Sequence, residues 1–488
     1  MSTRYISLPV RRIRMVGCSR NVLRRPAILL AILLAAAAAP YLSGGSLDAY
    51  FAGDDFEWLF GASALGWQRA FEVSTRSASY RPVIDLWFVG LRAVCGQGSA
   101  CHHAASLLVH LAAVAMLFTL ARLLCRDLRI AVIGAAMFAF QPAQVQAVVW
   151  VAAIPNTLGA AFLLASLLAQ ALSWESVSEG SRRAWEATAV SLFAAAVLSH
   201  EASITMLAVS GVMWHFFAPR SILRRPIMTI GLTVVCLFFA WATVVSNRSN
   251  ALFPEGRYGL GEHVVRHFFE FLAQLTVGPR WWLSDLLWIV ALAGLLVASR
   301  ATRFSTLWML VALLPYLGFT AGNVSRYHYV PAMGFSLALA AALVNASDWI
   351  ASRLPARRTW IAAGTAVVAA FLIIRFARFC YPAVESEARS LEPWREYAVM
   401  VRALNPGPVG PSIRVPAPED PAIEERYLQP MLRWLFQDND LQVIVERTAR
   451  RAEHAARSTQ HRARQVSPPH SPITFTTTRL RRRPSNSA

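Results

Sequence analysis

The chain has 488 residues, 56% of them hydrophobic, and its formal net charge is +19. A soluble protein of this length rarely has so large a hydrophobic share, and apolar runs near the ~20 residues needed to cross a bilayer recur along most of the chain. These features exclude an ordinary soluble globular protein and predict an all-α polytopic membrane protein.

The apolar runs predict about eleven transmembrane helices. Their approximate spans are 26–43, 103–124, 130–150, 155–174, 185–200, 202–218, 227–246, 282–298, 304–320, 329–350 and 359–379. Arginines cluster in alternate gaps, as at 122–129 and 220–225, and short cytoplasmic loops are enriched in this way. We therefore expect a basic cytoplasmic N-terminus over 1–25, a transmembrane domain over 26–380 and a C-terminus outside.

The first outer loop, 44–101, carries two adjacent carboxylates, Asp54 and Asp55, just after the first apolar run. Charge at a bilayer surface is costly to organise, and a carboxylate there is placed to act as a general base toward a lipid-borne substrate. The alternative is a helix cap, since Asp is a good N-cap. One residue of the pair can serve as cap and the other as base.

The same loop contains the segment 79–88, which is apolar but too short and too charged to span a membrane. It predicts an interfacial helix with Trp87 and Phe88 toward lipid and Arg81 and Asp85 toward water. Cys95 and Cys101 follow closely and lie outside, where disulfides persist. A disulfide and two free thiols both remain open.

Two later segments place polar residues at the outer surface. His200 and Glu201 stand where the fifth apolar run should emerge, and they can face the same cavity as Asp54. The second outer loop, 247–281, carries His263, His267 and Glu270 at helical spacing. These three residues are a weak indication of a metal site, and a solvated helix face is the favoured interpretation.

A short outer loop before the tenth apolar run contains Arg326 and His328, between aromatic residues. The cytoplasmic bias of arginine does not explain Arg326, and a guanidinium there is well suited to grip a phosphate. The neighbouring tyrosines also fit a membrane-interface belt.

The region after residue 380 divides into two parts. Residues 381–446 predict a small extracytoplasmic helical segment, with helices near 394–404 and 424–436. From 447 to 488 the composition is Arg, Ser, Thr and Pro, which predicts a disordered tail. A solvated tail is favoured over one that touches anionic lipids, and nucleic acid is not an expected partner.

Five passages in this order resemble membrane glycosyltransferases of the GT-C superfamily, and in particular bacterial relatives of the transmembrane-and-tetratricopeptide protein O-mannosyltransferases. The passages are Gly53–Phe56, Ser79–Pro82 with His102–His110, Phe138–Trp150, Leu198–Glu201 and Ser325–Phe335. The resemblance covers about residues 45–340 and rests on the ordered set, because no single passage is diagnostic.

The resemblance implies an inverting transferase of a bacterial inner membrane that uses a polyprenyl-phosphate sugar donor. Asp54 or Asp55 would be the base and Arg326 would contact the donor phosphate. Further candidate substrate-binding residues are Arg81, Gln146, His200, Glu201 and His328. The acceptor would be a protein, a glycan or a lipid. No cofactor is firmly implied, and a divalent metal remains open.

The chain departs from the family pattern in its third passage. The family has two histidines and a glutamate where this chain has Gln141, Gln144 and Gln146, and the tetratricopeptide repeats are missing. The main rival is therefore a non-catalytic relative that binds lipid-linked glycan or serves as a scaffold in an envelope complex. A transporter is a third alternative, disfavoured because no internal repeat is visible.

Overall fold

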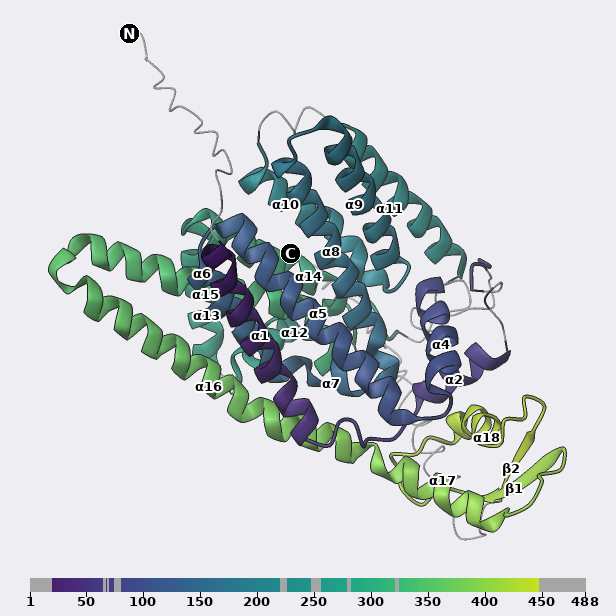
Figure 1. Ribbon diagram of the computed structural model, residues 1–488. Coiled ribbons are helices and arrows are strands. Elements are labelled where there is room, and N and C mark those ends of the chain that lie inside the picture. Colours follow the sequence, from purple (N-terminus) through teal and green to yellow (C-terminus); the bar gives the residue numbers. More distant parts are fainter. Residues whose placement is uncertain are drawn as a thin grey trace, which may run out of the picture.

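The computed structural model describes residues 20–64, 67, 70–73, 80–219, 226–246, 256–278, 282–320 and 324–446. Most of these residues form a bundle of helices (Figure 1). Its α-helices are α1 (Arg20–Ser43), α2 (Asp54–Ala64), α4 (Pro82–Cys95), α5 (Ser99–Cys125), α6 (Leu128–Ala139), α7 (Val145–Val149), α8 (Ile154–Glu175), α9 (Glu179–Val197), α10 (Met206–Phe217), α11 (Pro226–Ser246), α12 (His263–Thr276), α13 (Trp282–Val297), α14 (Arg300–Leu317), α15 (Tyr329–Arg353) and α16 (Arg358–Ser390). Short 3-10 turns lie at Pro142–Gln144, Val151–Ala153, Glu201–Thr205, Ser325–His328 and Pro355–Arg357.

Six helical stretches in the described residues are long and apolar enough to cross a membrane. They are Pro26–Ser43, Ser99–Cys125, Val151–Glu175, Met228–Ser246, Ser325–Arg353 and Pro355–Leu404, and one bent pair brings the number to seven. Every expected span contains helix, but the count of eleven is not confirmed. α10 and α13 are short, while α9 and α14 carry arginines in their first two turns.

The expected straight span 130–150 is bent. α6 and the stretch Pro142–Val149 meet at an angle of 54°. Pro142 cannot donate a backbone hydrogen bond, and the Gln141 side chain accepts from the N–H of Ala143 across the break at 3.4 Å. The bend places Trp150 at the turn that faces the first outer loop.

α14 and α15 pack with their backbones in close approach. A Cβ on Gly334 would lie only 2.6 Å from the backbone nitrogen of Met309 and 2.8 Å from the carbonyl oxygen of Ser305. Small residues allow such contacts between membrane helices. This packing holds the loop before α15, with Arg326, firmly against the bundle.

The segment after α16 is a small α/β unit, hereafter the C-terminal unit (392–446). It contains α17 (Glu392–Leu404), β1 (Ser412–Pro416), the 3-10 turn Glu425–Tyr427, α18 (Leu428–Phe436) and β2 (Gln442–Glu446). The two strands pair in parallel, with Ser412 opposite Gln442. The purely α-helical prediction is wrong here, because a crossover helix joins two short strands. The tail 447–488 lies outside the described residues.

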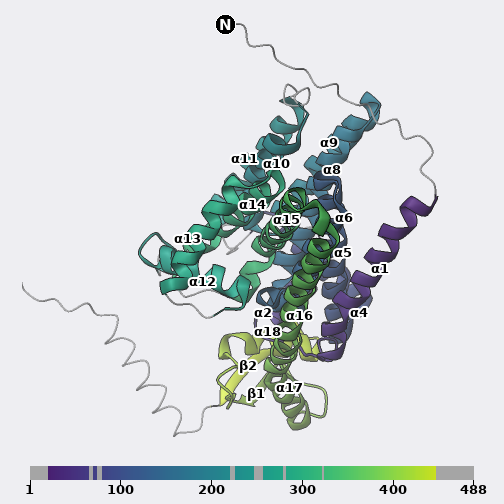
Figure 2. The same cartoon turned by 90° about the vertical axis from the view of Figure 1, so that its left-hand side faces the viewer.

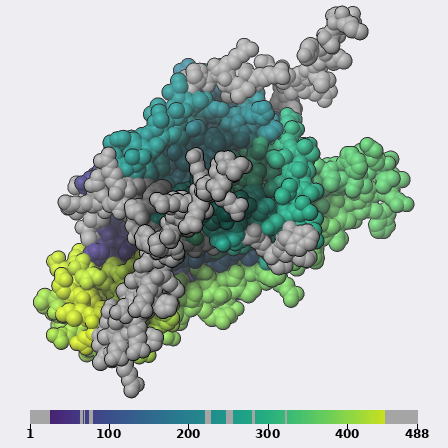
Figure 3. Space-filling model, turned by 180° about the vertical axis from the view of Figure 1, so that it is seen from behind, coloured from purple at the N-terminus to yellow at the C-terminus, as the bar shows by residue number. Residues whose placement is uncertain are grey.

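The C-terminal unit sits at one end of the bundle, beside α2 and α4 (Figures 1 and 2). From behind, it lies against the purple segment of the first outer loop, and the turn of the α15–α16 hairpin projects on the other side (Figure 3). α16 runs from that turn to the C-terminal unit as one continuous helix of 33 residues.

Candidate functional site

The two adjacent carboxylates at the start of α2 have different surroundings. Asp55 is fully buried. Its two oxygens accept hydrogen bonds from the N–H groups of Ala52 at 2.8 Å and Ala152 at 2.5 Å. Burial raises the pKa of Asp55 well above its usual range, although the two backbone bonds oppose that rise. This side chain ties the turn before α2 to the turn before α8.

Asp54 remains partly exposed beside it. The hydroxyl of Tyr427, from the C-terminal unit, donates a hydrogen bond to Oδ1 of Asp54. Burial is the larger cause, and this hydrogen bond the second, of a rise in the pKa of Tyr427 far above neutral pH. The phenol therefore stays protonated and remains a donor. Within the described residues, Oδ2 of Asp54 has no hydrogen-bond partner.

Trp150 connects the carboxylate turn to Arg326. Its indole N–H donates to the carbonyl oxygen of Ala52 at 3.2 Å. The guanidinium of Arg326 lies over the Trp150 ring at 4.9 Å and over the Tyr327 ring at 5.1 Å. Contacts of this kind between a cation and an aromatic face are favourable, so Trp150 fixes the position of Arg326 relative to Asp54.

The guanidinium of Arg326 also donates a hydrogen bond to the Gln146 side chain, 3.3 Å from Nη1 to Oε1. Gln146 in turn hydrogen-bonds to Glu387 near the end of α16. Within the described residues, no carboxylate oxygen lies within ion-pair distance of the guanidinium. Its direct contacts are thus to neutral groups, while the Glu387 carboxylate interacts with its charge without forming a direct ion pair.

Arg81, unlike Arg326, forms an ion pair with a carboxylate. Its guanidinium forms a two-point ion pair with Glu201, with Nε–Oε1 at 2.9 Å and Nη2–Oε2 at 2.8 Å. Burial alone would raise the pKa of Glu201, but Arg81 more than offsets this and holds the pKa below its ordinary value. The rings of Tyr316 and Tyr327 stack with their centroids 4.6 Å apart. Both tyrosines interact with the charges of Arg81 and Arg326. The sequence-predicted residues Gln146, Glu201, Arg81 and Arg326 therefore lie in one region, and Trp150 links it to the turn that carries Asp54.

The amphipathic segment near Arg81 is oriented differently from the prediction. α4 begins at Pro82, and Phe88 is fully buried against the Trp58 ring at a centroid distance of 5.7 Å. The prediction that Phe88 faces lipid is wrong. Asp85 is half-buried, and burial raises its pKa to about 6 while nearby Arg81 opposes the rise. α4 therefore packs on α2 beside the ion pair of Arg81 and Glu201.

Two sequence-predicted histidines bond to nearby backbone. His328 is fully buried, with Nδ1 3.1 Å from the carbonyl oxygen of Ser325, and its ring packs on Phe271. Nδ1 of His200 accepts from the N–H of Ala202 at 3.0 Å. Both rings thus hold short turns in place around the site.

Gln141 and Gln144 are fully buried. Their side-chain amides donate to the carbonyl oxygens of Leu275 at 2.9 Å and Phe138 at 2.5 Å. Of the three glutamines that stand where the family has charged or imidazole groups, only Gln146 reaches Arg326. The other two stabilise the bend after α6.

The described residues contain no group of three or more His, Cys, Asp or Glu side chains that could hold a metal ion. His267 is buried, whereas His263 and Glu270 are partly exposed, so the expected solvated helix face holds only in part. The ring of His267 lies 5.5 Å from that of His263, whose Nε2 is 3.1 Å from the carbonyl oxygen of Gly259. This part of α12 packs against the bundle.

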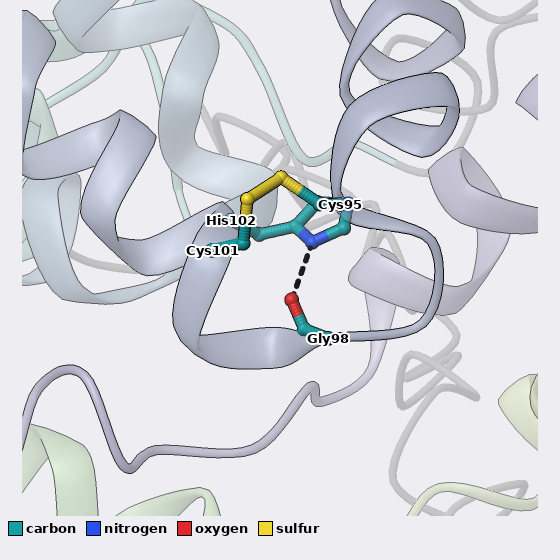
Figure 4. Close-up of a disulfide and its surroundings, with 4 residues drawn as sticks. All are labelled: Cys95, Gly98, Cys101 and His102. Carbon is teal, nitrogen blue, oxygen red and sulfur yellow. Dashed lines mark hydrogen bonds between the residues drawn. A yellow bond between two sulfur atoms is a disulfide. The ribbon is translucent and has the colours of Figure 1, made fainter.

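Cys95 and Cys101 form a disulfide, which confirms that alternative (Figure 4). His102, the residue after this loop, donates from Nδ1 to the carbonyl oxygen of Gly98 within it at 3.0 Å. Gln97, in the same loop, donates to the carbonyl oxygen of Trp434 at 2.7 Å. The disulfide loop therefore supports the C-terminal unit from the bundle side.

Three contributors to this region were not picked out from the sequence: Trp150, Glu387 and Tyr427. Each meets its partner through long-range folding, so local spacing gave no indication of its role. Trp150 ends the third family-like passage, and its place there was the available signal.

No protein-family model matches the sequence, and no curated protein matches it. Among solved structures, the apo oligosaccharyltransferase of Archaeoglobus fulgidus is similar, with a TM-score of 0.50 and 11% identity over 86% of this chain and 64% of that protein. The structure of ArnT from Cupriavidus metallidurans bound to undecaprenyl phosphate has a TM-score of 0.49 and 14% identity over 88% of each chain. The likeness to the oligosaccharyltransferase shows a shared fold.

Proposed function

We propose that this protein transfers a sugar from a polyprenyl-phosphate-linked donor to an acceptor hydroxyl at the outer face of a bacterial inner membrane. It would be an inverting hexosyltransferase, with a protein, a glycan or a lipid as acceptor. The GT-C-type fold supports a lipid-linked donor. Asp54 is the proposed general base and Arg326 the proposed ligand of the donor phosphate.

The observation that carries the proposal is the difference in burial and hydrogen bonding between the two carboxylates. Both oxygens of Asp55 accept backbone hydrogen bonds and the residue is fully buried. Asp54 is partly exposed and keeps Oδ2 without a partner in the described residues. A general base must reach the proton it removes, and Asp54 alone of the pair meets that requirement.

The proposed step is a single displacement. As the acceptor oxygen bonds to the anomeric carbon of the donor, its proton passes to Oδ2 of Asp54. The bond between the anomeric carbon and the phosphate oxygen breaks, and the lipid phosphate leaves with the electron pair. Arg326 stabilises the charge that develops on the phosphate, since charge-assisted contacts from arginine to phosphate are strong.

The remaining residues would shape the donor side. Gln146 orients Arg326, and the ion pair of Arg81 with Glu201 holds α4 next to the 3-10 turn that begins at Glu201. Neither Gln146 nor Gln144 can replace a catalytic carboxylate. The proposed chemistry therefore assigns proton removal to Asp54 and assigns no step to the glutamines.

The test is sugar transfer from labelled polyprenyl-phosphate sugars in membranes that contain each variant at equal levels. Asp54→Asn should lower the rate by about 10²–10⁴-fold, because it removes the basic site with little change in shape. Asp48→Asn, at an exposed position of the same loop, is the matched control and should keep full activity. Wild-type rates in Asp54→Asn would overturn the assignment.

A second candidate is a non-catalytic relative that binds lipid-linked glycan. Gln146 favours it, because the family has a glutamate at this position. In that case the wild type would transfer no sugar from any donor tested, yet Arg326→Ala would still weaken retention of a labelled polyprenyl phosphate. The same binding measurement on Asp54→Asn, with retention unchanged, would separate binding from catalysis.

A further inference from the structure

We propose that Tyr427 of the C-terminal unit is a positioning residue that holds the Asp54 carboxylate in the orientation needed to accept a proton. This inference rests on the proposed function, and it gives the C-terminal unit a part in the same site. The hydrogen bond from the phenol to Oδ1 is the observation that carries it.

The contact leaves the carboxylate usable. Tyr427 occupies Oδ1, while Oδ2 has no partner in the described residues. A hydroxyl that donates to a carboxylate favours its charged form. Tyr427 would therefore fix the rotamer of Asp54, and Oδ2 would face the acceptor.

The ring of Tyr427 is itself held from several sides. Arg426 lies over it at 4.5 Å, and Trp394 meets it edge-on at 6.2 Å. The ring lies over the turn at Gly53, whose φ of +53° favours glycine, and a Cβ there would make an ordinary contact with the ring at 3.5 Å. A donor fixed in this way orients its partner better than a mobile one.

The C-terminal unit is anchored independently of this bond. Arg92 lies over the Trp434 ring at 5.5 Å, and Arg433 lies over the Phe60 ring at 5.3 Å. Gln97 adds its bond to the carbonyl oxygen of Trp434. Removal of the Tyr427 hydroxyl should therefore leave the unit in place and change mainly the state of Asp54.

The charged and titratable groups around Asp54 come from two elements. Asp55 and Glu57 of α2, and Arg426 and Tyr427 of the C-terminal unit, interact with it electrostatically. Loss of the Tyr427 hydroxyl removes a donor that favours the charged carboxylate. Because the base acts when ionised, the acid side of the pH–rate profile moves to higher pH.

The experiment compares Tyr427→Phe with Tyr397→Phe in the full-length protein. Tyr397 belongs to the same unit, and its hydroxyl donates to the carbonyl oxygen of Pro416 at 2.8 Å without touching Asp54. We expect Tyr427→Phe to lower kcat by about 10–100-fold, as loss of a supporting bond to a functional group does, and to shift the acid limb upward with KM little changed. Tyr397→Phe should leave kcat and the acid limb unchanged.

A double-mutant cycle of melting temperatures in detergent tests the contact between Tyr427 and Asp54 separately from sugar transfer. Melting temperatures of wild type, Tyr427→Phe, Asp54→Asn and the double variant should be non-additive if the two side chains interact. Additive melting shifts, or an unmoved acid limb, would overturn the positioning role. Faster transfer by Tyr427→Phe would also overturn it, because the phenol would then occupy the place of the acceptor hydroxyl. Non-additive melting with an inactive wild type would instead reject the transfer reaction, and the catalytic role of this contact with it.

Discussion

At the scale of single residues, two neighbouring carboxylates serve different ends because helical geometry points them in different directions. Asp55 faces the bundle and satisfies two backbone donors, while Asp54 faces the C-terminal unit. A buried carboxylate with both oxygens bonded stabilises a fold only while its partners remain satisfied.

Asp55→Asn should therefore destabilise the protein more than it affects chemistry directly. Its amide nitrogen would face one of the two N–H donors, and a buried donor left without an acceptor costs about 1–3 kcal/mol. Thermal unfolding in detergent measures the effect. Asp48→Asn, which is exposed, is the control, and equal melting temperatures for the two variants would contradict the structural role.

The ion pair of Arg81 and Glu201 predicts a pH-dependent contribution to stability. The pKa of Glu201 is lower in the folded state than its ordinary value, so the pair stabilises the fold above that ordinary value. The contribution is lost as the pH falls through the lowered folded pKa. The melting gap between wild type and Glu201→Gln should thus be largest near neutral pH and close on acidification.

Glu396→Gln, at an exposed position of α17, serves as the control for that series. It should show no comparable gap at any pH. A gap for Glu201→Gln that widens on acidification would mean that the carboxyl is not held ionised by Arg81.

Among individual residues, the sequence indicated the pair Asp54 and Asp55 and also Arg326, but neither which carboxylate is partly exposed nor which side chains hold Asp54 and Arg326. Asp54 and Arg326 stand out because charge at a membrane surface is costly. Their partners Tyr427 and Trp150 are ordinary aromatic residues in sequence, and only folding brings them close. Phe88 was misplaced for a related reason, since an apolar side chain on an amphipathic helix can face either lipid or protein.

At the scale of elements, the disulfide loop between α4 and α5 links two parts of the chain. Its Gln97 donates to Trp434 in α18, and the bond between Cys95 and Cys101 restricts the loop that carries Gln97. Support for the C-terminal unit thus comes partly from a covalent link outside that unit.

Replacing both Cys95 and Cys101 by serine should loosen α18. We expect faster amide hydrogen exchange in residues 428–436, because opening reactions involve the less strongly held elements, while exchange in the middle of α5 stays unchanged. Cys125→Ser, at a free cysteine, is the matched control. Identical exchange in α18 of wild type and the double serine variant would show that the loop does not support the unit.

Apolar length predicted where helices lie, because the bilayer sets a minimum run of residues, but in the described residues only six or seven of the eleven expected spans are long and apolar enough to cross a membrane. It did not predict the bend at Pro142, where one apolar stretch becomes two helices. It also missed β1 and β2. These strands have five residues each and pair in parallel through a crossover helix, so no hairpin turn marks them in the sequence.

At the scale of the whole molecule, the alternating arginine clusters still predict a cytoplasmic N-terminus and an external C-terminal unit. A reporter fused after Glu446 should give an external signal, and one fused after Arg225 a cytoplasmic signal. The second fusion controls for expression and insertion. A cytoplasmic signal after Glu446 would place the C-terminal unit, and the Asp54 turn beneath it, on the opposite side.

The hydrogen bond between Asp54 and Tyr427 also orders the events of biosynthesis, since it joins residues 373 positions apart. A chain is made from its N-terminus and domains tend to fold in that order. Asp54 therefore emerges with the first helix, whereas its partner is made only after all the membrane helices. A nascent chain that stops before residue 427 contains the whole helix bundle but lacks the hydrogen-bond donor to Asp54. The site is therefore complete only when the C-terminal unit has folded.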